Sequence, residues 1–153
     1  MSEVLFYHLT EHRLEQALPG LVERSLGRGW RVAVQTSEPA RAAALSDLLW
    51  TFRADSFVPS GYPGWNDDDD RAAEQPVWLC ADEANPNGAA VRFLVEGARA
   101  DDLSAYERVV FMFDGHDESA VAAARAQWKR RKEEGHALTY WQQKPGGGWQ
   151  KAG

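Results

Sequence analysis

The segment "VLFYHLTEHRLEQALPGLVERSLGRGWRVAVQT" (Val4–Thr36) gives the clearest indication of the fold of this chain. It begins with the apolar run Val4–Leu9 and ends with a second run, Gly29–Thr36, and both are typical of buried strands. Between the two runs, leucines and other apolar residues recur at helical intervals. A second helical segment follows Thr36. Two strands that are each followed by a helix predict a right-handed βαβ unit and a parallel sheet.

The two helices carry recognisable start and break signals. Thr10 is suited to cap the first helix, because its hydroxyl can accept from a free backbone N–H group. Pro19 lies inside the same helix and predicts a kink or a break near Leu18. Pro39 falls in the first turn of the second helix, where a missing N–H group costs nothing.

The rest of the chain continues the alternation. Apolar runs predict further strands at Pro76–Ala81, Ala90–Glu96 and Arg108–Asp114. A helix is expected over Asp117–Glu134, with Gly135 as its C-terminal cap. The segment "HALTYWQQ" (His136–Gln143) alternates as a last strand, before a turn and a short tail.

One segment interrupts the alternation. Ser60–Pro76 mixes glycine, proline and acidic residues and is predicted to be a long acidic surface loop. The predicted fold class is therefore α/β, a three-layer α/β/α arrangement with a mixed, mainly parallel sheet. Residues 1–153 suit a single domain.

The composition, 44% hydrophobic and 26% charged residues, predicts a globular cytoplasmic protein. No apolar run has the roughly 20 residues of a membrane span, and no N-terminal targeting segment is expected. The single cysteine, Cys80, lies in an apolar run and is predicted to be a buried thiol. The net charge of −6 argues against general binding of duplex DNA, which requires a broad cationic surface.

No pattern for enzymatic chemistry is present. A nucleotide-binding α/β protein needs a glycine-rich turn after its first strand, but "TEHRLEQ" follows Leu9 here. No Ser or Cys is placed beside a base at a recognisable spacing. The run Asp67–Asp70 offers carboxylates to a hard cation, but its spacing matches no known loop and a solvated run is the preferred interpretation. We therefore expect no catalytic residue, no metal and no cofactor.

A cationic helical segment is the first candidate for binding. Between Arg125 and Lys132 the chain has five cations and no acid. At about 100° per residue, four side chains share one stripe: Arg125, Trp128, Lys129 and Lys132. The stripe suits an acidic peptide with an apolar anchor, or single-stranded nucleic acid. A solvated helix with its indole in the core is the structural alternative.

A second candidate is "LLWTFRADSFVP" (Leu48–Pro59), whose apolar and aromatic side chains are difficult to bury completely. It can expose a hydrophobic patch to a partner, and core packing is again the alternative.

The order and spacing of several short motifs resemble the chi subunit family of bacterial DNA polymerase III over nearly the whole chain. The motifs are "FYHL", "LLWTF…SFVP", "PVWL", "YERVVFMFD" and "R-x-x-WK…G-x-x-LTYWQQ". The resemblance implies an α/β fold similar to nucleotide-binding domains but without catalytic activity.

The resemblance also implies a role. Chi subunits are accessory components of the clamp-loader assembly and bind the acidic C-terminal tail of single-stranded-DNA-binding protein. Arg125 matches the family's principal tail-binding arginine, and the other three residues of the stripe accompany it. DNA is then reached only indirectly, through the protein that coats it.

In the same family, a second face binds the psi subunit or a helicase. Phe57 matches the aromatic residue of that contact, with Trp50, Val58 and Pro59 around it. This chain departs from the family pattern at Ser60, where many relatives have histidine. Our hypothesis is a non-enzymatic replication adaptor. The alternative is a nucleotide-binding or single-strand nucleic-acid-binding α/β protein.

Overall fold

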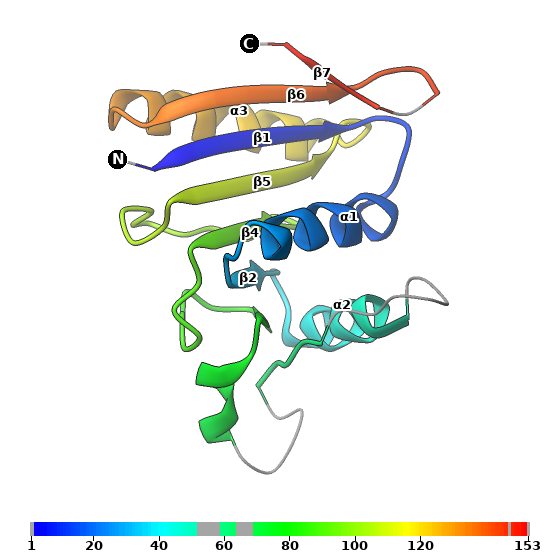
Figure 1. Cartoon of the computed structure of the whole chain (residues 1–153). Helices are drawn as coiled ribbons and strands as arrows, with labels where there is room; N and C mark the ends of the chain where they lie inside the picture. Colours follow the sequence, from blue (N-terminus) through cyan, green and yellow to red (C-terminus); the bar gives the residue numbers. More distant parts are fainter. Residues whose placement is uncertain (1, 52–58, 64–68, 147, 153) are drawn as a thin grey trace.

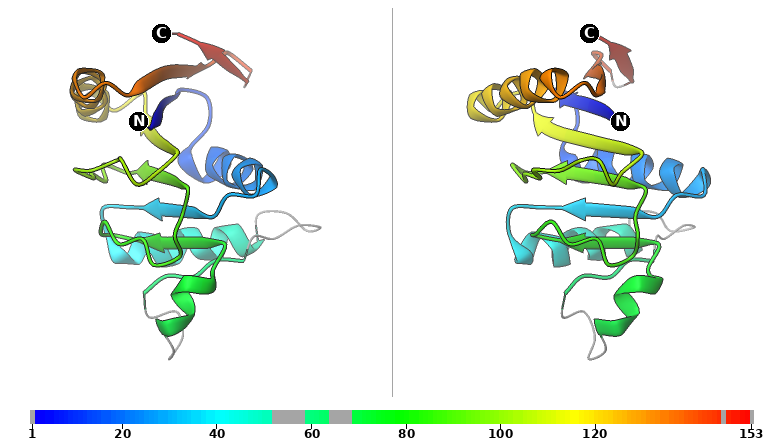
Figure 2. Two further views of the ribbon diagram at one scale, coloured as in Figure 1. Left: turned by 60° about the vertical axis from the view of Figure 1, so that its left-hand side comes forward. Right: turned by 90° about the vertical axis from the view of Figure 1, so that its left-hand side faces the viewer.

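The computed structural model describes residues 2–51, 59–63, 69–146 and 148–152. Within them, one seven-stranded sheet has the order β3-β2-β4-β5-β1-β6-β7. Helices α1 and α2 cover one face, and α3 covers part of the other (Figures 1 and 2). Every strand pair is parallel except β6–β7, which is antiparallel. The predicted α/β class with a mixed, mainly parallel sheet is confirmed.

The elements have the following bounds: β1 Glu3–Leu9, α1 Leu14–Gly27, β2 Val32–Gln35, α2 Pro39–Thr51, the 3₁₀ helix η1 Asp69–Glu74, β3 Val77–Cys80, β4 Val91–Val95, β5 Arg108–Asp114, α3 Glu118–Glu133, β6 Ala137–Gln143 and β7 Trp149–Lys151. Strands β2, β3 and β4 are buried at every position. This explains why their sequences are continuous apolar runs, since a parallel strand covered on both faces has no solvent side.

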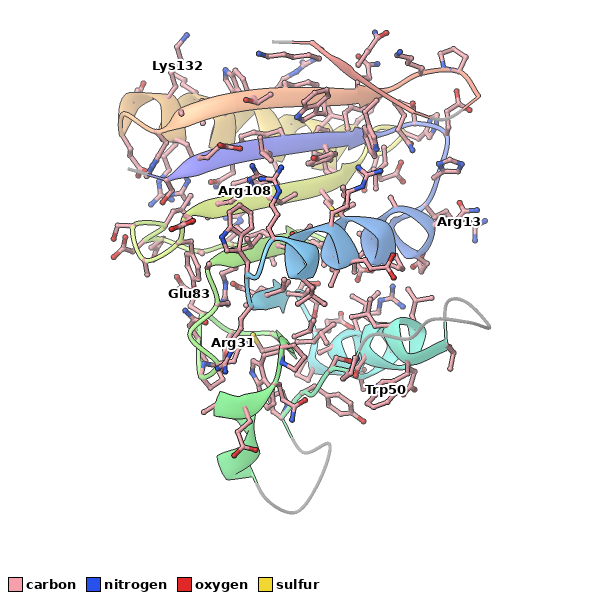
Figure 3. All side chains as sticks on the ribbon, viewed as in Figure 1. Arg13, Arg31, Trp50, Glu83, Arg108 and Lys132 are labelled. Carbon is pink, nitrogen blue, oxygen red and sulfur yellow. The ribbon has the colours of Figure 1, made fainter. Side chains whose placement is uncertain are left out.

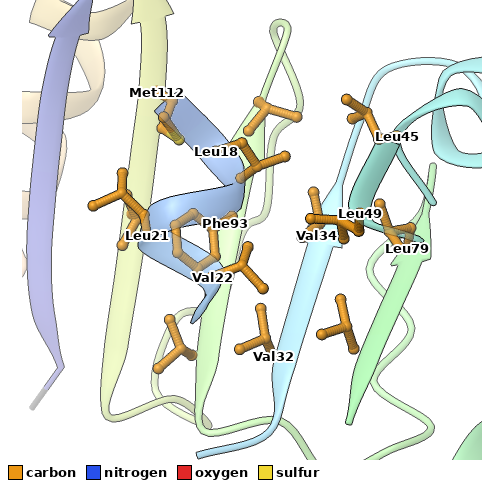
Figure 4. Packing of buried hydrophobic residues seen from close by; sticks show 14 of the residues in the cluster. Leu18, Leu21, Val22, Val32, Val34, Leu45, Leu49, Leu79, Phe93 and Met112 are labelled. Atoms are coloured by element: carbon orange, nitrogen blue, oxygen red, sulfur yellow. The ribbon is translucent and has the colours of Figure 1, made fainter. Parts of the chain in front are cut away.

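The larger core lies between the sheet and the helices α1 and α2 (Figure 4). Leu18 and Val22 of α1 are fully buried with Phe93 of β4. Leu45 and Leu49 of α2 belong to the same buried cluster, above β2 and β3. Each such side chain contributes about 1.5–3 kcal/mol by leaving water, so this face fixes the position of both helices.

A second core lies beneath α3. Phe6 of β1 stacks on Phe111 of β5, with ring centroids 4.7 Å apart. Ala124 of α3 and Leu103 of the β4–β5 connection close this cluster. Because α3 is fixed by small and aromatic contacts on this side, its opposite face is free to carry charge.

The start of α1 differs from the prediction. The helix begins at Leu14, and Thr10 does not cap it. The backbone N–H groups of Thr10, Glu11 and His12 instead donate to the side-chain oxygen of Gln143, at 3.0, 2.9 and 3.0 Å. The acceptor comes from β6, so a distant side chain replaces the local cap that the sequence suggested. The helix also runs unbroken through Pro19.

The segment Ser60–Pro76 also differs from a plain surface loop. Gly61 forms a parallel bridge with Trp78 of the edge strand β3. Its N–H group donates to Val77 O at 3.1 Å, and its carbonyl accepts from Leu79 at 2.8 Å. A short 3₁₀ helix, η1, then leads into β3. An edge strand with free backbone groups favours such pairing, which the loop composition does not reveal.

The tail after the last predicted strand is a strand as well. Trp149, Gln150 and Lys151 pair with β6 as the antiparallel β7. The turn between them contains Gly146, whose φ of 88° suits glycine.

Candidate peptide-binding site on helix α3

Helix α3 is held firmly at both ends. The Asp117 carboxylate caps its first turn by accepting from Ser119 N at 3.0 Å and Ala120 N at 3.3 Å. These hydrogen bonds lower the pKa of Asp117 below its ordinary value. Gly135 follows the last turn with a φ of 88°, as the sequence predicts. The side chains between these caps therefore project from a fixed frame.

Of the four predicted residues of the stripe on α3, three are exposed cations, and the fourth, Trp128, packs toward β1 and β6. Arg125, Lys129 and Lys132 are exposed, and Lys132 projects away from the sheet (Figure 3). Trp128 is half-buried: its ring packs edge-on against Phe6 at 5.4 Å and lies 5.9 Å from Tyr140. The indole thus contacts the core and also remains partly accessible beside three cations.

The other two cations of the segment do not belong to this surface. Arg131 is completely buried and donates to the carbonyls of Ala100 and Asp101, the latter at 3.0 Å. It also donates to Glu134 at 3.0 Å. Arg130 forms an ion pair with Glu134 at 3.3 Å and donates to the Asp101 carbonyl at 3.3 Å. The run of five cations is therefore divided into three for the stripe and two that hold α3 to the β4–β5 connection.

Two side chains that the sequence analysis missed adjoin the stripe. His8 Nδ1 and the Tyr140 hydroxyl share a hydrogen bond of 2.6 Å. Burial lowers the pKa of His8, and the positive charge of Arg125 lowers it further. Burial raises the pKa of Tyr140, whereas Arg125 opposes that shift. Arg125 is thus close enough to influence both groups electrostatically.

The position of His8 depends on one glycine. A Cβ atom on Gly115 would lie 2.1 Å from His8 Nε2 and 2.8 Å from the Leu9 carbonyl. The alternation of β6 could have placed Tyr140 on the α3 side of the sheet. Its contact with His8 required the parallel pairing of β1 and β6, which the sequence did not specify.

The second predicted surface is described only in part. Phe57 and Val58 lie outside the described residues. Pro59 is exposed, and Trp50 of α2 is 42% exposed (Figure 3), with its indole N–H 3.4 Å from the Ser60 carbonyl. Ser60 itself is buried and bonds to Ser46 at 2.6 Å, so its side chain is not part of the exposed surface.

A large cavity of about 850 Å³ lies where the loops after β1, β4 and β5 meet. Nucleotide-binding α/β proteins bind ligands in this crevice. Here the backbone N–H groups after β1 already donate to Gln143. Five carboxylates line the cavity: Glu11, Glu15, Glu96, Asp114 and Asp117. The arrangement therefore disfavours a phosphate.

The structure also bears on the predictions for the cysteine, the acidic run and a membrane span. Cys80 is buried as predicted, and burial raises the pKa of its thiol. Asp67 and Asp68 of the acidic run lie outside the described residues. Elsewhere in the described chain, no three His, Cys, Asp or Glu side chains are grouped to hold a metal. Over the same residues, no helix is both long and apolar enough for a membrane span.

Comparison with known proteins identifies the family. The model of the family described as "DNA polymerase III chi subunit, HolC" matches residues 1–139. The chain belongs to the chi subunit family. Chi subunits are non-catalytic accessory subunits of DNA polymerase III, in agreement with the absence of an enzymatic pattern from the sequence.

A curated relative agrees with this chi-family assignment. The "Probable DNA polymerase III subunit chi" of Rickettsia prowazekii (strain Madrid E) is 24% identical over 95 residues. The match covers 62% of this chain and 55% of the relative, so it spans about half the length of that protein.

Proposed function

We propose that this chi-family chain binds the acidic C-terminal tail of single-stranded-DNA-binding protein and thereby links coated DNA to the clamp-loader assembly in the cytoplasm. The proposal is supported by the part of α3 where Arg125, Lys129 and Lys132 are exposed near the half-buried Trp128. In this role the chain reaches DNA through the coating protein.

The chemistry of the tail fits this face. A guanidinium can donate two parallel hydrogen bonds to a carboxylate, and Arg125 is the one exposed arginine of the four-residue stripe. The two lysines add charge without fixed geometry. The accessible part of Trp128, beside Tyr140, offers an apolar surface to an apolar side chain that anchors the end of the tail.

Fluorescence anisotropy with a labelled copy of the acidic tail tests this role. The wild type should bind the peptide, and binding should weaken as salt is raised. Arg125→Ala should reduce the affinity by about tenfold or more, because a charge-assisted hydrogen bond contributes roughly 1.5–3 kcal/mol.

Arg130→Ala is the matched control. It removes the same charge from the same helix, but its guanidinium pairs with Glu134 rather than joining the stripe. It should change the affinity by less than about twofold, as expected for loss of an exposed ion pair outside the interface. Equal losses in both variants would reduce the effect to net charge, and no peptide binding by the wild type would refute the proposal.

We also propose that the exposed surface around Trp50 and Pro59, together with Phe57 and Val58, binds psi or a helicase. Its support is the large exposed fraction of the Trp50 ring. Trp50→Ala should weaken co-purification with that partner while leaving tail binding intact. Unchanged co-purification would remove Trp50 from the interface.

The alternative of a nucleotide-binding protein makes a distinct prediction. A panel of nucleotides should raise the melting temperature if one of them binds the folded state. We expect no shift, because the backbone N–H groups after β1 already donate to Gln143 and carboxylates line the crevice. A concentration-dependent shift would favour the alternative.

A further inference from the structure

The face of the sheet that carries α1 has a second cationic surface. Within the described chain, α1 and α2 lie over the side of this face that holds β4 and β2 and leave β1, β6 and β7 uncovered (Figure 1), and α2 also packs on β3. A small cavity of about 120 Å³ lies at the border between α1 and the uncovered strands. Its lining includes Arg24 and Arg28 from α1 and its C-terminal cap, Arg108 from β5, and Tyr7 from β1.

The positive charge of this cavity is only partly neutralised. Arg108, beside the C-terminal end of α1 in Figure 3, pairs with Glu3 at 2.9 Å. Arg24 and Arg28 are exposed, and neither forms an ion pair within the described residues. Arg28 and Arg108 both lie over the ring of Trp30, at 5.2 and 5.1 Å from its centroid, and this contact orders their guanidinium groups.

Aromatic side chains continue from the cavity across the uncovered strands. Tyr7 of β1 is in register with Trp141 of β6, and Trp141 with Lys151 of β7. Trp149 meets Tyr7 edge to face, with ring centroids 4.8 Å apart. All three rings are half-buried, and Lys151 is exposed at the edge of the sheet. The surface is thus an arginine-lined cavity next to an aromatic row.

We propose that this surface, defined by Arg24, Arg28 and Arg108 with the aromatic row Tyr7, Trp141 and Trp149, binds single-stranded nucleic acid. The cavity accepts a backbone phosphate, and adjacent bases stack on the row. Cationic side chains that follow the backbone, together with aromatic side chains under the bases, are what sequence-independent single-strand binding requires. The cavity is large enough for a phosphate but small for a peptide side chain with its backbone.

Charge complementarity favours an anionic strand over an apolar partner. Three of the four ionised side chains that act on Tyr7 are arginines, and Glu3 is the fourth. A duplex fits poorly, because its bases are not available to stack. The inference is independent of the proposed tail binding, which uses the opposite side of the sheet, and it adds a direct contact with the strand to the indirect one.

The test uses two double variants with the same change in charge. Binding of labelled oligothymidylate, about 20 nucleotides long, is measured by anisotropy at low salt and again as salt is raised. Arg24→Ala/Arg28→Ala should weaken binding by about tenfold and reduce the salt slope by about 1.4, the expected value for two lost phosphate contacts. Arg125→Ala/Lys129→Ala should leave this binding within about twofold while abolishing binding of the acidic tail peptide.

Three outcomes would contradict the proposal. Oligonucleotide binding that is lost equally in both double variants would reflect net charge and overturn the proposal. No oligonucleotide binding by the wild type would also overturn it, without affecting tail binding. If Arg24→Ala/Arg28→Ala loses the peptide and keeps the oligonucleotide, the surface is a peptide site and the proposal is wrong. Circular dichroism of both variants establishes that they are folded.

Discussion

The two cationic surfaces of this chain are built in different ways. The stripe on α3 takes its cations from a single helix, within eight residues of sequence. The surface beside α1 takes its arginines from α1 and β5, so that Arg28 and Arg108 meet over Trp30 although they are far apart in the chain. Helical periodicity can therefore reveal the first kind of site in a sequence, whereas the second kind becomes visible only when the order of the strands is known.

A cationic side chain is not always exposed and free to bind a ligand. Arg131 belongs to the most cationic run of the chain, yet it is completely buried. Arg24 lies in the last turn of α1 and Arg28 is its C-terminal cap, and both are exposed without a carboxylate partner in the described chain. Counting cations along the sequence therefore overstates the first surface and overlooks the second.

The largest expected effect is the loss of stability when the buried arginine of α3 is replaced, compared with an exposed arginine of the same helix. Arg131→Met should lower the free energy of unfolding by about 3 kcal/mol, because Glu134 and two backbone carbonyls lose a buried donor. Arg125→Met, at an exposed position, should change it by less than about 0.5 kcal/mol. Urea denaturation measures both values. Similar losses for the two variants would show that burial does not distinguish them.

A somewhat smaller loss of stability is expected when the turn after β1 loses its contact with β6. Gln143→Met should destabilise the protein by about 2 kcal/mol, because the backbone N–H groups of Thr10, Glu11 and His12 lose their acceptor. Methionine keeps a similar length and volume, so the comparison isolates the hydrogen bonds. A midpoint of thermal unfolding equal to that of the wild type would mean that water replaces the lost acceptor without cost.

The smallest expected effect is a dependence of tail binding on pH. His8 is neutral near pH 7, since burial and the charges of His116 and Arg125 lower its pKa, while Asp114 opposes the shift. An acidic tail bound beside Arg125 should favour the protonated form. Tail affinity should therefore rise about two- to fivefold as the pH falls below the ordinary histidine value of about 6.5. Anisotropy titrations at several pH values measure the rise.

His8→Gln is the control for this pH dependence, and it should remove most of the rise. Oligonucleotide binding beside α1 should not depend on His8, which lies on the α3 side of the sheet with Tyr140. The lowered pKa of His8 also makes the free energy of unfolding depend on pH. The unfolded state takes up the proton more readily, so the contribution of His8 to stability is complete above about pH 6.5 and decreases as the pH falls. If tail affinity still rises at low pH in His8→Gln, the rise belongs to another group.

Much of the fold was predictable because its signals are local. The apolar runs of β2, β3 and β4 are continuous because these strands are buried on both faces. The cap at Asp117 and the glycine after α3 fix that helix from neighbouring residues alone. The shared stripe of Arg125 and Lys129 follows from helical geometry in the same way.

Other features depended on contacts between distant segments, and the sequence could not supply them. The acceptor for the turn after β1 is a glutamine more than a hundred residues later, and it displaced the predicted cap at Thr10. Strand β7 exists because the edge of β6 offers unpaired backbone groups. Composition and periodicity were enough to predict the α/β class, the approximate positions of β1 to β6 and the spacing of the stripe residues along α3, since these depend on neighbours along the chain. The burial of Arg131, the contact of His8 with Tyr140 and the three arginines around one cavity follow only from the tertiary structure, because strand order and register set burial and electrostatic partners.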